Sequence, residues 1–188
     1  MRTARRAALV GALTLAAALA TAPPASAEER TCRGTIGATT VDNLRVPQGA
    51  TCTLKGTRVQ GTIKVERSAT LHAYGVRVIG NVQGENAANV RVLDGSTVGG
   101  SVQVVQGRAA RVADSRVTGK ILFDDNGARV DAVRNRVGGD IQAFQNTGGV
   151  SISRNTVDGN LQCKENVPAP TGGGNIVHGN KEDQCRRL

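Results

Sequence analysis

The sequence predicts an all-β protein: a single-stranded, right-handed parallel β-helix, or β-solenoid, of about seven coils of 19–20 residues with disulfide-stapled ends. Two observations predict this fold. A short frame of valine, glycine and a second aliphatic residue recurs every 19 or 20 residues, and four cysteines are spaced by one period or slightly more. Such internal repeats are typical of solenoids, in which each repeat packs only on its neighbours.

The frame Val-x-Gly-x-(Ile/Val/Leu) is the most regular part of the repeat. It occurs six times, at VQGTI (59–63), VIGNV (78–82), VGGSV (98–102), VTGKI (117–121), VGGDI (137–141) and VDGNL (157–161). Each period also carries further pairs of apolar residues two positions apart, such as Val90/Val92 and Val102/Val104. Because apolar residues that alternate with polar ones indicate half-buried strands, each period predicts three short strands. We expect each strand to pair with its equivalent in the next coil.

Other repeat architectures do not fit this pattern. Helical repeats need apolar residues at i, i+3 and i+4, whereas these periods are rich in Val, Thr, Asn and Gly. A leucine-rich repeat needs several leucines per period, and the left-handed hexapeptide helix needs an aliphatic residue at every sixth position. Neither pattern is present, so a right-handed coil is predicted.

The N-terminal 27 residues differ in composition from the repeat. They have a basic start (Arg2, Arg5, Arg6), a short apolar stretch and a small-x-small cleavage signal, ASA at 25–27, which is the pattern of a secretory signal peptide. No other stretch is long and apolar enough to predict a membrane span. We therefore expect a secreted, extracellular protein in which residues 28–188 form one β-solenoid domain, with repeats at about 44–166 and capping ends at 28–43 and 167–188.

The C-terminal period departs from the apolar pattern. Pro170 and Gly172 take the register that Val150 and Ile152 hold one period earlier. Proline and glycine weaken strand pairing, so we expect them to remove a strand and to protect the open edge of the solenoid.

Four cysteines in an exported chain indicate two disulfides, for which three pairings exist. Cys32 and Cys52 are 20 residues apart, and Cys163 and Cys185 are 22 apart. Equivalent residues of adjacent coils lie ~4.8 Å apart, within disulfide range, whereas the other pairings would span most of the rod. The repeat therefore favours Cys32–Cys52 and Cys163–Cys185, one staple at each end.

Asparagine recurs in two columns at the predicted corners. The members of the columns are Asn126, Asn146 and Asn166, and Asn135, Asn155 and Asn175. Asparagine tolerates the left-handed conformation that corners need, and stacked amides can hydrogen-bond along the solenoid axis. We therefore interpret both columns as structural ladders.

Two outward-facing columns form a candidate binding face. One is the glutamine column of Gln83, Gln103, Gln142 and Gln162, and the other is the arginine column of Arg58, Arg77, Arg116 and Arg136. The glutamines could hydrogen-bond a polysaccharide, although a solvated sheet face is the simpler interpretation of a strip without aromatic platforms. The arginine column is interrupted by Thr97 and Thr156. Like charges ~5 Å apart repel, so the arginines indicate interleaved acids or an anionic partner, although a solvated charged face is the commoner outcome.

Composition narrows the class of partner. Without the signal arginines the chain has 21 basic and 15 acidic residues, a formal net charge of +6. Nucleic-acid binding would need a recognisable module or stacking aromatics, and the only aromatic residues are Tyr74, Phe123 and Phe144. We therefore expect either an anionic or neutral envelope polysaccharide as partner or no particular partner, and no nucleic acid. Because His72 and His178 are separated and unaccompanied, no metal site and no cofactor are predicted.

Enzymatic motifs are weak. The segments FDDNG (Asp124, Asp125) and VHGN (His178) resemble polygalacturonase motifs, but they lie over fifty residues apart and the Arg-Ile-Lys motif of that family is absent. Asp125 and Glu165 share a column two coils apart, which permits but does not indicate a glycosidase pair. We expect a non-catalytic protein, with a pectinase-like polysaccharide lyase or hydrolase as the alternative.

The chain resembles the small secreted bacterial right-handed β-helix repeat proteins, a group without an assigned activity. The resemblance covers residues 32–185 and depends on the Val-x-Gly frame, the asparagine columns and the paired cysteines. The frame is also similar to that of bactofilin-type polymerising β-helices, although the signal peptide and the capped ends differ from those proteins. These resemblances imply the fold, and the expected function is a structural or binding module at the cell envelope or in the extracellular space.

Overall fold

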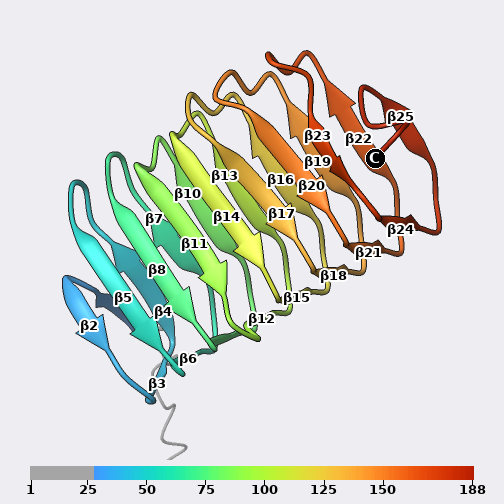
Figure 1. Ribbon diagram of the computed structural model, residues 1–188. Coiled ribbons are helices and arrows are strands. Elements are labelled where there is room, and N and C mark those ends of the chain that lie inside the picture. The colour runs from blue at the N-terminus through green and yellow to red at the C-terminus, as the bar shows by residue number, and fades with distance from the viewer. Residues whose placement is uncertain (1–27) are drawn as a thin grey trace, which may run out of the picture.

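The computed structural model describes residues 28–188, which form a parallel β-solenoid without a helix (Figure 1). The predicted signal peptide at 1–27 lies outside the described residues. Three parallel sheets, which we name A, B and C, run along the solenoid, and each coil contributes one strand to each sheet.

The strands of the three sheets follow in the order B, C, A within a coil. Sheet A contains β1 (Glu29–Thr31), β4 (Asn43–Val46), β7 (Ile63–Val65), β10 (Val82–Glu85), β13 (Val102–Val105), β16 (Ile121–Asp124), β19 (Ile141–Phe144), β22 (Leu161–Lys164) and β25 (Lys181–Asp183). Sheet B contains β2 (Gly34–Ile36), β5 (Thr51–Lys55), β8 (Thr70–Tyr74), β11 (Asn89–Leu93), β14 (Ala109–Ala113), β17 (Val130–Val133), β20 (Val150–Ser153) and β23 (Thr171–Gly173). Sheet C contains β3 (Thr40–Val41), β6 (Arg58–Val59), β9 (Arg77–Val78), β12 (Thr97–Val98), β15 (Arg116–Val117), β18 (Arg136–Val137), β21 (Thr156–Val157) and β24 (Ile176–Val177).

The chain winds in the right-handed sense. In Figure 1 it runs down the near face along sheet B, passes below through sheet C and returns behind along sheet A, while it advances from the blue end to the red end. The strands of sheets B and C form eight coils, one more than the expected seven. The extra coil was missed because the terminal segments lack the apolar frame: VHGNK at 177–181 ends in Lys181, which pairs with Leu161.

Alternate residues of each strand point into a continuous core, as the apolar pattern predicts. Equivalent aliphatic residues stack directly on each other, for example Val102 on Ile121 and Ile121 on Ile141, and all three are fully buried. Phe123, also fully buried, fills the neighbouring column between Val104 and Ala143. Every interior position thus faces equivalent apolar positions in the coils before and after it, and the core continues along the rod.

The repeated glycine has a steric cause. A Cβ atom built on Gly80 would lie 2.6 Å from the carbonyl oxygen of Gly61, and one on Gly119 would lie 2.7 Å from that of Gly100. Neither glycine needs a positive φ, so close approach of successive coils, rather than backbone freedom, excludes a side chain there.

The C-terminal coil corrects one expectation. Pro170 and Gly172 do not remove a strand, because β23 pairs in parallel with β20 through Ser151–Thr171 and Ile152–Gly172. The exposure of this strand does differ from its predecessors: Thr171 and Gly172 are both exposed, whereas Ile152 is fully buried. The proline–glycine segment therefore places fewer buried side chains in the last coil, but it still forms a strand that pairs with β20.

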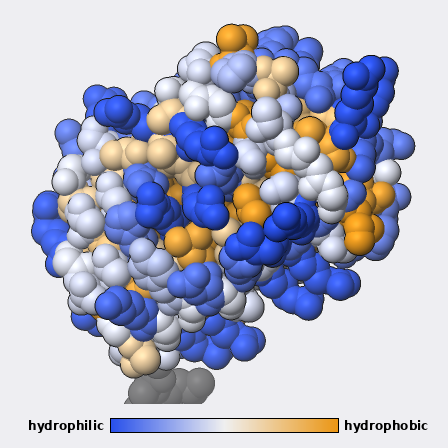
Figure 2. Space-filling model, in the orientation of Figure 1, coloured by the Kyte–Doolittle hydropathy of each residue, from blue (hydrophilic) through white to orange (hydrophobic). Residues whose placement is uncertain are grey.

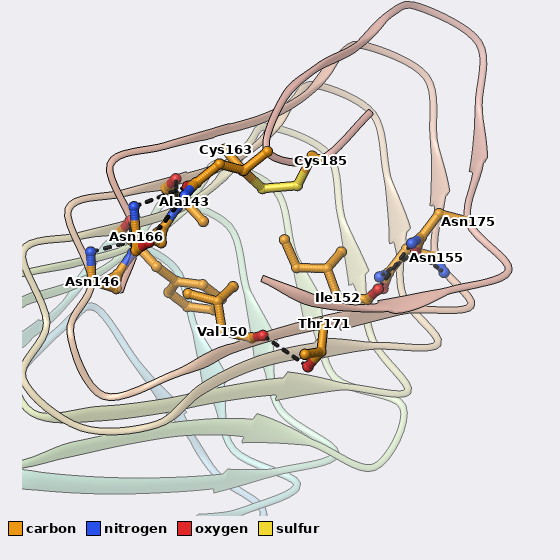
Figure 3. The surroundings of a disulfide bond; sticks show 12 residues. Ala143, Asn146, Val150, Ile152, Asn155, Cys163, Asn166, Thr171, Asn175 and Cys185 are labelled. Atoms are coloured by element: carbon orange, nitrogen blue, oxygen red, sulfur yellow. Dashed lines mark hydrogen bonds between the residues drawn. A yellow bond between two sulfur atoms is a disulfide. The ribbon is translucent and has the colours of Figure 1, made fainter. Parts of the chain in front are cut away.

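Both disulfides pair as the repeat favours. Cys32 is bonded to Cys52 with a Cα–Cα distance of 5.6 Å, and Cys163 to Cys185 with 5.1 Å. Each bond joins neighbouring coils near one end of the rod, and Figure 3 shows the second one above the last buried side chains of the core.

Candidate functional site

The asparagine columns are ladders of buried amides. Asn146 accepts hydrogen bonds at Oδ1 from the backbone N–H and the Nδ2 of Asn126, at 3.1 and 2.9 Å, and donates from Nδ2 to the carbonyl of Phe123 and to Oδ1 of Asn166. Asn155 repeats this arrangement at the other corner, between sheets B and C. Figure 3 shows the C-terminal parts of both ladders on opposite sides of the core.

One detail of the corner prediction is wrong. The left-handed conformation is adopted not by the ladder asparagines but by the residue before them, as at Asp125 (φ 53°), Gln145 (φ 53°) and Arg154 (φ 57°). The asparagine itself has to turn its amide across to the next coil, while the preceding, outward residue takes the sharp bend. The ladders are therefore satisfied within the fold and are not free for a ligand.

A third ladder of hydrogen bonds between coils lies one residue after the repeated glycine. Asn81 Oδ1 accepts from the backbone N–H of Ser101 at 2.8 Å, and Asp140 Oδ1 accepts from that of Asn160 at 2.7 Å. Its acceptors are Asn43, Thr62, Asn81, Ser101, Asp140 and Asn160. The sequence does carry a signal for this ladder: the residue after each repeated glycine has a small side chain with an acceptor oxygen, except at Lys120.

The glutamine column divides into two parts at Leu122. In the C-terminal part Gln142 donates to Gln162 at 2.7 Å, and Gln162 donates to Glu182 at 2.9 Å, so these amides bond along the axis. In the N-terminal part Gln83 and Gln103 line a groove of about 820 Å³ on sheet A.

The groove on sheet A has lining groups of both charge signs. Lys64 and Arg67 lie in it together with Glu66 and Glu85. Glu66 accepts from Arg45 Nη1 at 3.3 Å and from the backbone N–H of Gln48 at 3.0 Å, and the hydrogen bond from Arg45 is the main cause that lowers the pKa of Glu66. Sequence analysis missed this pair of carboxylates because neither lies in a recognisable motif.

The arginine column lies on the outward face of sheet C. Its register is direct: Arg58 pairs with Arg77, Arg77 with Thr97, Thr97 with Arg116, and Arg116 with Arg136. All four arginines are exposed. None of the ion pairs found in residues 28–188 involves these four arginines, and no acid is interleaved between Arg58 and Arg136 along this column. Compensation by interleaved acids is thus removed, which leaves an anionic partner or a solvated charged face as the explanation of the column.

Sheet B presents a mixed face. Figure 2 shows hydrophilic and apolar side chains scattered over the near face, without one dominant patch. His72 and Tyr74 form a roughly parallel ring pair with centroids 6.5 Å apart. Burial, with a smaller contribution from the nearby Arg91, lowers the pKa of His72. Arg111 and Arg129 are both paired with Asp131, at 3.1 and 2.8 Å, so two arginines share one carboxylate on this face.

The acids and the histidine of the polygalacturonase-like motifs are not brought together. Asp124 ends β16 of sheet A and Asp125 occupies the following corner, whereas His178 follows β24 of sheet C and pairs with Asp158 at 3.2 Å. Within 28–188 there is no cluster of three or more His, Cys, Asp or Glu side chains that could hold a metal ion, and no helix suited to crossing a membrane.

Comparison with protein-family models, with curated proteins and with solved structures finds no match to this chain. We therefore infer a function from the outward faces of the three sheets.

Proposed function

We propose that this protein is a non-catalytic, secreted β-solenoid that binds an anionic polysaccharide of the cell envelope or extracellular space through the arginine column of sheet C. The observation that carries the proposal is the uncompensated register of Arg58, Arg77, Arg116 and Arg136 on one exposed face. The signal-peptide pattern and the two disulfides support an oxidising, extracellular location.

Physical chemistry favours an extended anion as the occupant. Guanidinium groups at a coil spacing of ~4.8 Å repel each other, and a polymer with regularly spaced carboxylates relieves that repulsion along its length. Arginine also binds carboxylates through two parallel hydrogen bonds, which gives direction as well as charge attraction. Because the solenoid already orders the backbone of the column, binding costs little backbone entropy, and the entropic cost on the protein side comes from the arginine side chains.

Titration calorimetry with a polyuronate, and with neutral dextran as comparison, tests the proposal. The R58Q/R77Q/R116Q/R136Q variant should lose at least about fourfold in affinity for the polyuronate, since each exposed ion pair contributes about 0.2–1 kcal/mol. A matched control removes the same charge from exposed arginines off the column: R33Q/R91Q/R108Q/R187Q. Equal losses for the two variants would mean that net charge, not the column, is responsible, and the proposal would then fail.

A second candidate function, hydrolysis or lysis of a polysaccharide, is favoured by one observation. Glu66 and Glu85 occupy equivalent positions of adjacent coils and both line the groove on sheet A. A coil spacing of ~4.8 Å is near the carboxyl separation of about 5–5.5 Å in retaining glycosidases. Incubation of the protein with neutral and uronic-acid polymers should then release reducing ends or unsaturated products, and E85Q should abolish the release. Product formation that is unchanged in E85Q would exclude this pair.

A further inference from the structure

The arginine column is interrupted at Thr97, and the surface is hollowed at that point. The hollow, which we name the notch, has a volume of about 310 Å³ and is lined by Arg77, Ile79, Thr97, Gly99, Arg116 and Thr118. It lies midway along the column, between Arg77 and Arg116.

Two small residues, Thr97 and Gly99, create the notch. Thr97 stands in register between Arg77 and Arg116, and its side chain is far shorter than an arginine. Two residues later the chain has Gly99, while the coils on either side have Ile79 and Thr118. A Cβ atom on Gly99 would overlap the carbonyl oxygen of Ile79, so the packing of the coils keeps the floor of the notch free of a side chain.

The walls of the notch are both cationic and apolar. Arg77 and Arg116 are exposed, and their Cα atoms are two coils, ~9.6 Å, apart. Ile79 is 46% exposed, one of three large apolar side chains with that exposure in residues 28–188, and the other two lie in the last coil. An exposed isoleucine beside two arginines matches a ligand that carries an anionic group on a ring with an apolar face.

We propose that the notch binds a single acidic sugar unit, a uronate, of the polysaccharide. Its carboxylate lies between the guanidinium groups of Arg77 and Arg116, and the C–H face of its ring packs on Ile79. Thr97 lies between the two arginines along the column. The inference depends on the proposed function, and it adds that one residue of the polymer is recognised by shape as well as charge.

A substitution that adds positive charge but fills the notch distinguishes binding in the notch from binding to the charge of the column. T97R completes the arginine column, and the strand accepts it because arginine already occupies this register at residues 77, 116 and 136. T156R is the matched control, since it adds the same charge to the same column next to Arg136 and outside the notch.

Affinities for a short oligouronate are measured by calorimetry, with thermal unfolding as a check on the fold. T97R should weaken binding by at least about fivefold despite its added charge, as expected for loss of charge-assisted hydrogen bonds, while T156R should bind as tightly as wild type or tighter. I79S, which leaves the charge unchanged, should also weaken binding. If T97R binds as tightly as T156R, the notch is not the site, although the arginine column stands. If wild type does not bind the oligouronate or the polyuronate, both proposals fail.

Discussion

At the scale of single residues, stability depends on asparagine amides whose donors and acceptors are used within the fold. Asn146 contributes four hydrogen bonds between three successive coils, and its side chain is fully buried. A buried amide with all its partners is stabilising, but the same environment makes each partner costly to expose once the amide is removed.

N146A should therefore destabilise the protein strongly. The substitution leaves the backbone N–H of Asn126 and the carbonyl of Phe123 without these partners in the interior, and each orphaned buried group costs about 1–3 kcal/mol. T147A, one residue on and exposed, should change the free energy of unfolding by less than about 0.5 kcal/mol. Chemical denaturation of the two variants measures the difference, and similar midpoints would contradict the ladder's structural role.

At the scale of the repeating element, the coil spacing is maintained by a column of glycines. A Cβ atom on residue 119 would lie only 2.7 Å from the carbonyl oxygen of Gly100, because the corner of one coil packs directly on the backbone of the previous one. This contact explains why glycine recurs in the frame even though its φ angles there are ordinary.

G119A should destabilise the solenoid by about 1–3 kcal/mol, the usual cost of overpacking a well-packed site. G127A is the control, because a Cβ there meets nothing within 4 Å and the backbone needs no positive φ. Thermal unfolding should show a clear loss for G119A and little change for G127A. A neutral G119A would mean that the coils can separate without cost, against the packing described here.

The sequence predicts some of these elements well for a physical reason. Burial enforces alternation, so the inward residues, the period and the disulfide pairs follow from spacing alone. The corners are different: the left-handed position is occupied by Asp125, Gln145 or Arg154, a set without a common composition. Likewise the third ladder uses Asn, Thr, Ser and Asp as acceptors, which resemble an ordinary solvated strip in the sequence.

The candidate site was predicted only in part for a related reason. The arginine column is visible as a repeat, because register alone places its members. The notch depends on the short side chain of Thr97, on the absence of a side chain at Gly99 and on the exposure of Ile79. These three features form a hollow only when adjacent coils are stacked, which the sequence does not show. The groove on sheet A with Glu66 and Glu85 was missed because the two acids belong to different, unremarkable segments.

At the scale of the whole molecule, the solenoid is a rod with three different faces. Sheet C carries a cationic column without interleaved acids, sheet B has two arginines that share Asp131, and sheet A contains the mixed groove and the axial glutamine chain. A rigid rod with one cationic face is suited to lying along a linear polyanion, whose charges it meets in register. The central claim is that this face, and not the net charge, determines binding.

The dependence of polyuronate affinity on salt tests this claim most directly. Exposed charge pairs are screened by salt, and release of counterions makes the logarithm of the binding constant fall linearly with the logarithm of salt concentration, in proportion to the number of contacts. Wild type should show a steep fall, and the variant without the four column arginines a markedly shallower one, while the off-column variant of equal charge keeps the wild-type slope. Equal slopes for all three proteins would contradict the account.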